Sequence, residues 1–295
     1  MSIGAEIEEE RLGGLVLVCF EKEKVRIISE IGEREGGELV LGHFRAATMS
    51  IGFEIGERGR SPLVVDQPEG GYRYSMDPFL LVSFVRLKRG EKVIDFGSGV
   101  GVIGIVLAAL YPDANITGIE IQRELHEASL RNIEINDLLN RVNSRLGDFR
   151  RIGDYFRPSS FTAAVSNPPY YREDDCRVSG KMGVAAAKHG ITGGIKEIID
   201  ESSLVLKAGG SLSIIYPAEK YQYLETLLND GGFSIKRVRF VKSMERLEAR
   251  TVMLEAVLGV TAQTEVTAPL VVHDEDGGYT NEVGKIFTRI GIESP

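Results

Sequence analysis

Residues 161–171, FTAAVSNPPYY, place an asparagine, two prolines and two tyrosines after an apolar run typical of a buried strand. Proline cannot donate to a β ladder and holds the preceding residue extended, so the strand must end here in a stiff loop. The Asn167 side-chain oxygen and the Pro168 carbonyl can each accept one proton of a planar amino group, and Tyr170 can stack on its ring. The plainer alternative is a stiff loop whose tyrosine only packs.

The chemistry that such a motif favours is transfer of a group to a planar nitrogen. This nitrogen is a poor nucleophile because its lone pair is delocalised into a ring or a carbonyl group. A site must therefore hydrogen-bond the amino protons and hold the nitrogen in line with the incoming group. No strong general base is required, since the nitrogen can lose its proton after the transfer.

A glycine cluster in residues 93–104, VIDFGSGVGVIG, follows another apolar strand-like run. Gly99, Gly101 and Gly104 satisfy the GxGxxG spacing, and Glu120 ends the next apolar run, where a dinucleotide enzyme keeps its ribose carboxylate. A nicotinamide cofactor is therefore one interpretation. Another alternative is that the glycines serve only a tight turn from strand to helix, with the acids as solvated strand ends.

The second functional interpretation takes the whole run DxGxGxG together with two later acids. In it the glycines let the backbone pass close to an adenosyl-type ligand and Asp95 faces an ammonium group. Glu120 can bind ribose hydroxyls, and Asp148, at the end of a third strand, can accept from an adenine amino group. This ordered set predicts a site for S-adenosylmethionine (SAM). Its residues are Asp95, Gly97, Gly99, Gly101, Glu120 and Asp148.

The elements that must position these residues alternate as strand and helix from residue 91 onward, which predicts an α/β fold with a mostly parallel sheet and helices on both faces. We expect strands at 92–97, 115–120, 142–148, 161–167, 210–217, 236–241 and 251–259. We expect helices at 102–111, 123–139, 194–207 and 219–229.

The first sixty residues read differently, with short β-type runs at 14–20, 24–30, 37–44 and 49–57. Glycine, proline and charge then come together in residues 56–71, a composition typical of a connection between modules. We therefore expect a small β-rich N-terminal extension, residues 1–62, before the main domain, residues 63–295. The extension can serve dimerisation, RNA docking or no separate role.

Composition limits the class of protein. A hydrophobic content of 43% with 26% charged residues is typical of soluble globular proteins, and no apolar stretch approaches the roughly 20 residues of a membrane helix. The acidic N-terminus does not resemble a signal peptide, so a cytoplasmic protein is expected. Two cysteines and four histidines show no ligand spacing, and no metal is predicted. The net charge of −8 argues against non-specific coating of nucleic acid but allows a local basic patch.

With both motifs in place, the chain resembles the class I SAM-dependent amino-methyltransferases with [DNS]PPY motifs. Within them it is most similar to the tRNA1(Val) (adenine(37)-N6)-methyltransferase family, over about residues 66–290. The matching segments are GYRYSMDPFLL, DFGSGVG, GIE, GD, NPPYY, AAAKHGIT and the tail PLVVHDEDGGYTNEV. NPPY is shared with DNA and ribosomal RNA methyltransferases and with release-factor glutamine methyltransferases, whereas the tail is the most group-specific part.

The resemblance implies a Rossmann-like, seven-stranded fold, SAM as cofactor and tRNA as partner. By position, it implies that the donor contacts are Asp95, Gly97, Gly99, Glu120 and Asp148. It also implies that Asn167 and Tyr170 hold the acceptor base, and that Asp77 lies at the edge of the same pocket.

The implied reaction is methylation of the exocyclic N6 of adenine in tRNA. A single-stranded loop makes the required unstacking of the base cheaper than a duplex does. The basic run 236–250, with Arg246 and Arg250, can meet phosphate, as can Lys188, or these side chains are simply solvated at a sheet edge. The alternatives are methylation of a protein glutamine at N5, which offers the same planar NH2 group, and a non-catalytic SAM-binding module.

Overall fold

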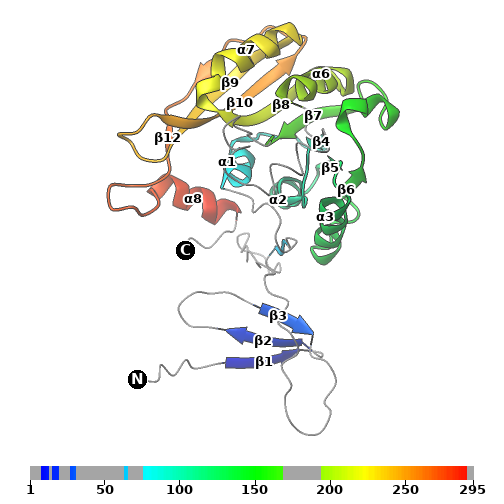
Figure 1. Cartoon of the computed structure of the whole chain (residues 1–295), viewed down its shortest axis with the longest axis vertical. Helices are drawn as coiled ribbons and strands as arrows, with labels where there is room; N and C mark the ends of the chain where they lie inside the picture. Colours follow the sequence, from blue (N-terminus) through cyan, green and yellow to red (C-terminus); the bar gives the residue numbers. More distant parts are fainter. Residues whose placement is uncertain are drawn as a thin grey trace, which may run out of the picture.

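The computed structural model describes residues 63–65, 76–168 and 194–290 in full. It also describes the backbone of three N-terminal strands: β1 (Glu8–Leu12), β2 (Leu15–Cys19) and β3 (Ile27–Glu30). These strands form an antiparallel sheet with β2 in the centre (Figure 1). β2 and β3 fall within two of the expected β-type runs and β1 was not expected, while the expected runs at 37–44 and 49–57 lie outside the described residues.

The main sheet has nine strands in the order β11-β9-β10-β8-β7-β4-β5-β6, with β12 paired to β9. Its seven long strands are β4 (Lys92–Phe96), β5 (Asn115–Glu120), β6 (Val142–Leu146), β7 (Phe161–Ser166), β8 (Leu206–Pro217), β9 (Phe233–Lys242) and β10 (Ala249–Leu258). Each contains the core of one expected strand. The two short strands β11 (Glu265–Val266) and β12 (Leu270–Val271) were not expected.

The pairing is parallel from β8 through β7, β4 and β5 to β6, which confirms the mostly parallel α/β sheet. β10 is the exception, because it runs antiparallel to both β8 and β9. β9 and β10 are therefore an antiparallel hairpin, and β9 itself points in the same direction as the parallel strands.

Helices cover both faces of the sheet (Figure 1). One face carries α1 (Asp77–Phe84), α2 (Val102–Leu110), α3 (Arg123–Ile135) and α8 (Asn281–Ile290). The other carries α6 (Ile195–Val205), α7 (Tyr221–Asp230) and the 3-10 helix η1 (Phe149–Asp154). A second 3-10 helix, η2 (Ala218–Lys220), directly precedes α7. Apolar residues fill both interfaces, so the sheet has a buried core on each side.

The local sequence explains which helices are central. α2 is apolar on all sides and almost fully buried, as expected for a helix packed between the sheet and its neighbours. α3 is amphipathic and buries only one stripe, which includes Ala128 and Ile133. Every residue of β4 after Lys92 is buried, which is typical of a central parallel strand.

The short segment 63–65 is fixed to this core. Val65 is fully buried, and the Asn136 side chain bonds the backbone of Val64 twice. The Asn136 Oδ1 accepts from the Val64 N–H at 2.9 Å, and the Asn136 Nδ2 donates to the Val64 carbonyl at 2.6 Å. The Asn136 amide thus satisfies both backbone groups of Val64, as a neighbouring strand would, and fixes this segment beside the end of α3.

None of the helices among the described residues combines the length and the apolar character needed to cross a membrane. In the same part of the chain, no group of histidine, cysteine, aspartate and glutamate side chains could hold a metal ion.

Candidate active site

Several of the expected site residues lie at one edge of the sheet, because the carboxyl ends of parallel strands meet there. Asp95 lies near the end of β4, Glu120 ends β5, and Asp148 follows β6. Asp95 pairs with Val165 of β7, so Asn167, two residues further, leaves the sheet at the level of the glycine loop. The sequence motifs that were far apart along the chain therefore share this edge.

A buried hydroxyl links the two central strands directly before their loops. The Ser166 Oγ at the end of β7 donates to the Phe96 carbonyl at the end of β4, at 2.9 Å. On the other side of β4, the N–H groups of Gly97 and Ser98 both donate to the Ile119 carbonyl of β5, at 3.0 and 3.2 Å. The start of the glycine loop is thereby held between its two neighbouring strands.

The glycine loop needs glycine for two different reasons. Gly97, Gly99 and Gly101 all have positive φ, at 69°, 55° and 86°, a region that most side chains disfavour. A Cβ on Gly101 would also lie 2.5 Å from the Ser129 Oγ of α3, so that hydroxyl would have to move before a side chain could fit. A Cβ on Gly99 would meet no atom within 4 Å, which leaves open space beside the backbone where a ligand can approach.

Two carboxylates are buried beside this loop. Asp95 is 1% exposed, and neither of its oxygens has a hydrogen-bond partner among the described residues. Burial, together with the nearby charge of Glu120, raises the pKa of Asp95 to about 8. Unpartnered carboxylate oxygens in a dry position are costly unless a positive group joins them.

Glu120 is 4% exposed and supports the loop directly. Its Oε2 accepts from the Gly99 N–H at 2.9 Å and its Oε1 accepts from the Gln122 N–H at 2.8 Å. Each oxygen keeps a lone pair for a further donor, so holding the loop and binding a hydroxyl group are compatible.

This electrostatic arrangement argues against the dinucleotide interpretation. A dinucleotide places its anionic pyrophosphate at the glycine loop and the following helix N-terminus. Here the position beside the loop is taken by Asp95, a buried acid that offers a pyrophosphate no positive charge and would repel it once ionised, whereas Glu120 is compatible with either ligand. A ligand with positive charge fits better.

Asp148 has a different environment. Its Oδ1 accepts from the Arg150 backbone N–H at 3.0 Å, and the Arg150 Nε lies 2.9 Å from both carboxylate oxygens. The Arg150 Nη2 donates to the Asp148 Oδ2 at 2.6 Å. The Arg150 hydrogen bonds lower the pKa of Asp148, so its carboxyl group is ionised at neutral pH.

Tyr155 positions the backbone that carries Asp148. The Tyr155 hydroxyl accepts from the Asp148 N–H at 3.3 Å, and its ring lies so close to Gly147 that a Cβ there would be 2.8 Å away. The Arg145 guanidinium lies 4.8 Å from the centre of the same ring. The glycine of the GD motif is thus explained by the tyrosine packed against it.

The acceptor motif is described in part. Asn167 is half-buried, Pro168 is buried, and Tyr170 lies outside the described residues. Asp77 is the first residue of α1 and half-buried. Arg246 is exposed in the turn between β9 and β10, Arg250 is exposed on the second residue of β10, and Lys188 lies outside the described residues.

Sequence reasoning missed Ser98 and Tyr155. Ser98 is buried, and its Oγ has no hydrogen-bond partner in the described part of the chain. A Cβ on Gly118 would lie 2.6 Å from this Oγ, so the glycine of the GIE motif leaves room for the serine. Gly118 was the only feature of the sequence that could have pointed to this contact, but a glycine does not show which side chain packs against it.

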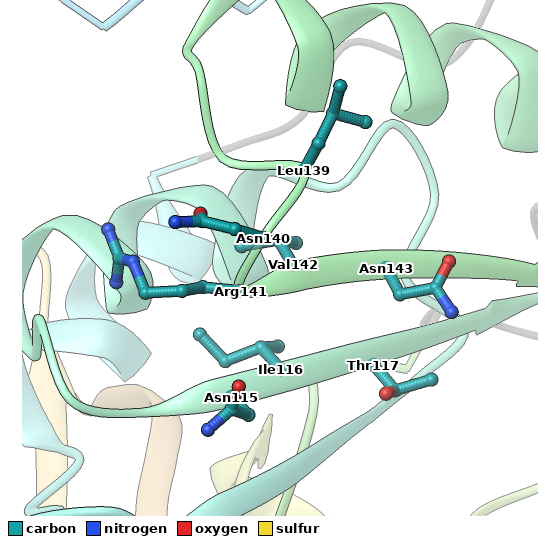
Figure 2. A pocket seen from close by; sticks show the side chains of 8 residues that line it. All are labelled: Asn115, Ile116, Thr117, Leu139, Asn140, Arg141, Val142 and Asn143. Atoms are coloured by element: carbon teal, nitrogen blue, oxygen red, sulfur yellow. The ribbon is translucent and has the colours of Figure 1, made fainter.

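A shallow pocket lies at the opposite edge of the sheet, near the start of β5 and β6 (Figure 2). Thr117 and Asn143 lie next to each other on these paired strands, and Leu139, on the connection before β6, is 66% exposed. The one cation in its lining, Arg141, donates to the Ala108 carbonyl. This lining holds no carboxylate, so the pocket is not part of the site.

Comparison with known proteins identifies the family to which the chain belongs. Residues 78–242, more than half of the chain, match the methyltransferase small domain family. The chain belongs to this family. Membership implies SAM as the methyl donor, and the site fits that ligand, because SAM carries an ammonium and a sulfonium group and the buried Asp95 and Glu120 lack a cation among the described residues.

Curated relatives of this methyltransferase are similar over most of their length. A protein of Shewanella sp. strain MR-7 is 25% identical over 224 residues, which are 74% of this chain and 92% of the relative. A protein of Porphyromonas gingivalis strain ATCC 33277 is 24% identical over 196 residues, which are 65% of this chain and 76% of the relative. Both relatives are named tRNA1(Val) (adenine(37)-N6)-methyltransferase.

A solved structure supports the fold of this methyltransferase. The crystal structure of a predicted O-methyltransferase from Agrobacterium tumefaciens superposes with a TM-score of 0.58 and 22% identity. The match covers 75% of this chain and 99% of the other. At this identity the likeness concerns the fold alone.

The glycine loop of this methyltransferase yields a paired prediction. We expect Gly101→Ala to lower the free energy of unfolding by about 1 to 3 kcal/mol, because it combines an unfavourable φ with a contact to Ser129. We expect Gly99→Asn to fold normally, since asparagine tolerates this conformation, but to bind SAM at least about tenfold more weakly. Urea denaturation and calorimetric titration with SAM measure the two effects. Wild-type stability for the first variant, or wild-type affinity for the second, would contradict this account of the loop.

Proposed function

We propose that this protein transfers the methyl group of SAM to the exocyclic N6 of adenine in tRNA, with adenine 37 of a valine tRNA as the target. The carrying observation is the position of Asn167 and Pro168, which leave β7 beside the glycine loop and the buried Asp95. The names of the relatives support the choice of acceptor, because they specify this nucleotide.

In this proposal, three carboxylates hold the donor. Asp95 accepts from the ammonium group, which relieves its unpartnered oxygens, and Glu120 accepts from ribose hydroxyls with its free lone pairs. Asp148 accepts a hydrogen bond from the adenine amino group. This bond either shares a carboxylate oxygen with Arg150 or replaces one of the Arg150 hydrogen bonds. Gly97, Gly99 and Gly101, with their positive φ angles, provide the backbone that SAM approaches closely. When bound, SAM supplies a methyl group activated by its sulfonium.

The acceptor motif holds the reacting nitrogen. The Asn167 side-chain oxygen and the Pro168 carbonyl each accept one amino proton, which orients the nitrogen toward the donor side of the loop. Tyr170 stacks on the adenine, and Asp77 borders the same pocket from the start of α1. The proton that the nitrogen must lose leaves after the transfer, so no side chain is needed as a strong base.

The domain organisation in this proposal has its boundary between residues 62 and 63. Residues 63–295 form the methyltransferase domain, and residues 1–62 form a β-rich N-terminal extension. The burial of Leu63 and Val65 and the bonds between Asn136 and Val64 support this start, since they join segment 63–65 to the core.

The function is tested by supplying the purified protein with methyl-labelled SAM and, in separate reactions, unmodified tRNA or unmethylated release factor. The products are digested and identified by mass spectrometry. The proposal predicts N6-methyladenosine in the tRNA and no label in the protein. Label in a glutamine of the release factor would instead assign the Asn167 site to a protein amide, and SAM binding without transfer to either would favour a non-catalytic module.

A further inference from the structure

The basic residues of the run 236–250 differ in what they contact. Lys236 and Arg237 both bind Glu255 on the neighbouring strand β10, at 2.9 Å and 2.7 Å. Arg237 is buried, and its guanidinium also donates to the Phe84 carbonyl and lies 3.8 Å from the centre of the Phe84 ring. Burial alone would raise the pKa of Glu255, but the hydrogen bonds from Lys236 and Arg237 outweigh it and lower that pKa. These two cations therefore join β9 to β10 and α1.

Two further cations of the run are also engaged within the fold. The Arg239 Nη2 donates to Glu282 at the start of α8 at 2.7 Å, and its Nε donates to the Ala268 carbonyl at 3.0 Å. The Lys242 Nζ donates to the Glu245 carbonyl at 2.6 Å. The charge of these side chains is used to hold α8 and the β9–β10 turn.

Arg246 and Arg250 are different, because both are exposed and neither forms an ion pair with an acid in the described part of the chain. Arg250 lies at a β-bulge, where the pairing with β9 shifts from Ala249–Lys242 to Thr251–Val241 and leaves Arg250 without a partner residue. Bulges turn a side chain away from its regular direction and are common next to active sites.

These arginines lie at the same edge of the sheet as Asn167. β8 and β9 both run antiparallel to β10, so the β9–β10 turn follows the carboxyl end of β9. Thr251 of β10 pairs with Pro217, the last residue of β8, and η2 begins directly after it and packs beside β10. Lys220 ends η2, is exposed, and likewise forms no ion pair among the described residues.

We propose that Lys220, Arg246 and Arg250, the rim cations, bind phosphate groups of the RNA strand next to the target adenine. This inference rests on the proposed function. When a base leaves its stack, the RNA backbone on either side of it must be held in a fixed position on the protein. Lysine and arginine contacts to phosphate provide that positioning. The rim cations are suited to it because their charge is not neutralised by the described residues and because Asn167 leaves β7 at the same edge of the sheet.

An acidic turn limits the path of the RNA. Residues 274–276, Asp-Glu-Asp, are exposed after β12. This turn is tied to the β9–β10 turn, because the His273 N–H donates to the Ser243 carbonyl at 2.8 Å. Phosphate is repelled on that side, so the strand passes over the bulge and η2.

The test measures how the affinity for unmodified tRNA depends on salt. We expect the triple variant Lys220→Gln, Arg246→Gln, Arg250→Gln to reduce the slope of log K against log salt by about 2 to 3, because each lost phosphate contact removes close to one unit. At about 0.1 M salt, tRNA affinity should fall roughly tenfold or more, with SAM affinity unchanged.

The matched control is the triple variant Arg86→Gln, Lys88→Gln, Lys207→Gln. Its three residues are exposed, carry the same total charge and lie near the starts of β4 and β8, at the opposite edge of the sheet. This control should keep the wild-type slope. An unchanged slope in the rim variant, or an equal reduction in both variants, would overturn the inference about the rim cations. The proposed function would still stand in that case if the wild type methylates tRNA. A wild-type protein that neither binds nor methylates tRNA would overturn both.

Discussion

Replacement of Asn167 by alanine is expected to reduce methyl transfer to tRNA by about 10²- to 10³-fold while SAM affinity stays within about twofold. The physical reason is that the side-chain oxygen acts on the acceptor, by accepting an amino proton as the nitrogen is attacked. The donor contacts belong to other strands: Asp95 of β4, Glu120 of β5 and Asp148 after β6. Single-turnover transfer with labelled SAM gives the first quantity, and calorimetric titration with SAM gives the second.

The control for this prediction is Asn167→Asp, which keeps an acceptor oxygen at the same distance from the backbone. It should retain more of the transfer rate than the alanine variant, with a similar melting temperature. Because Asn167 is half-buried at the end of β7, a structural role is the competing explanation. Loss of SAM binding in step with loss of transfer in the alanine variant would establish that structural role and reject the catalytic one.

The second large effect is expected for Asp95→Asn, which keeps the shape of the side chain and removes its charge. SAM affinity should fall by about tenfold to a hundredfold, the usual effect of losing a hydrogen bond to a charged group. Because the Asp95 carboxyl group has a pKa of about 8 without the donor, it is largely protonated at neutral pH. Binding of the ammonium group requires it to ionise, so wild-type binding at neutral pH should release close to one proton. The buffer dependence of the binding enthalpy measures that proton, and the asparagine variant should not release it.

The same substitution should have the opposite effect on stability. In the folded protein the pKa of Asp95 is raised to about 8, above its ordinary value of about 3.9 in an unfolded chain. The folded state therefore holds this proton more tightly, and the resulting stability is fully present below about pH 3.9 and is lost as the pH rises to about 8. Asp95→Asn has no such titration, so its stability relative to the wild type should increase over this range and level off above it.

Urea denaturation of both proteins without SAM, at several pH values between about 5 and 9, measures this difference. If Asp95→Asn binds SAM more weakly and its stability relative to the wild type rises with pH, then Asp95 serves SAM binding and lowers the stability of the fold at high pH. A constant difference across the range would mean that the Asp95 carboxyl group is solvated or partnered, contrary to the burial described here.

The parallel sheet and the three acids at its carboxyl edge could be predicted from the sequence. Apolar runs of strand length alternate with longer helical patterns, and parallel strands bring their carboxyl ends together, so Asp95, Glu120 and Asp148 could be placed at one edge without coordinates. The ends of elements were less readable. A helix was expected to reach residue 139, but α3 ends at Ile135, where Asn136 bonds segment 63–65 and Asp137 adopts a φ of 54°.

Contacts between distant residues account for the rest of what the sequence did not predict. The two-residue strands β11 and β12 are too short to show a period. The pairing of Arg237 with Glu255 depends on the register of two strands, and that of Arg150 with Asp148 depends on side-chain direction. For this reason the sequence could name Arg246 and Arg250 as phosphate contacts but could not show that the other four cations of the basic run, Lys236, Arg237, Arg239 and Lys242, are engaged in the fold.

The most direct test of the central claim uses two transcripts of a valine tRNA that differ only at position 37, one with adenine and one with guanine. Each is incubated with the protein and labelled SAM, and the nucleosides are separated and identified by mass spectrometry. The account predicts N6-methyladenosine in the first transcript and no label in the second. Equal labelling of both transcripts, or label in a nucleoside other than N6-methyladenosine, would contradict it.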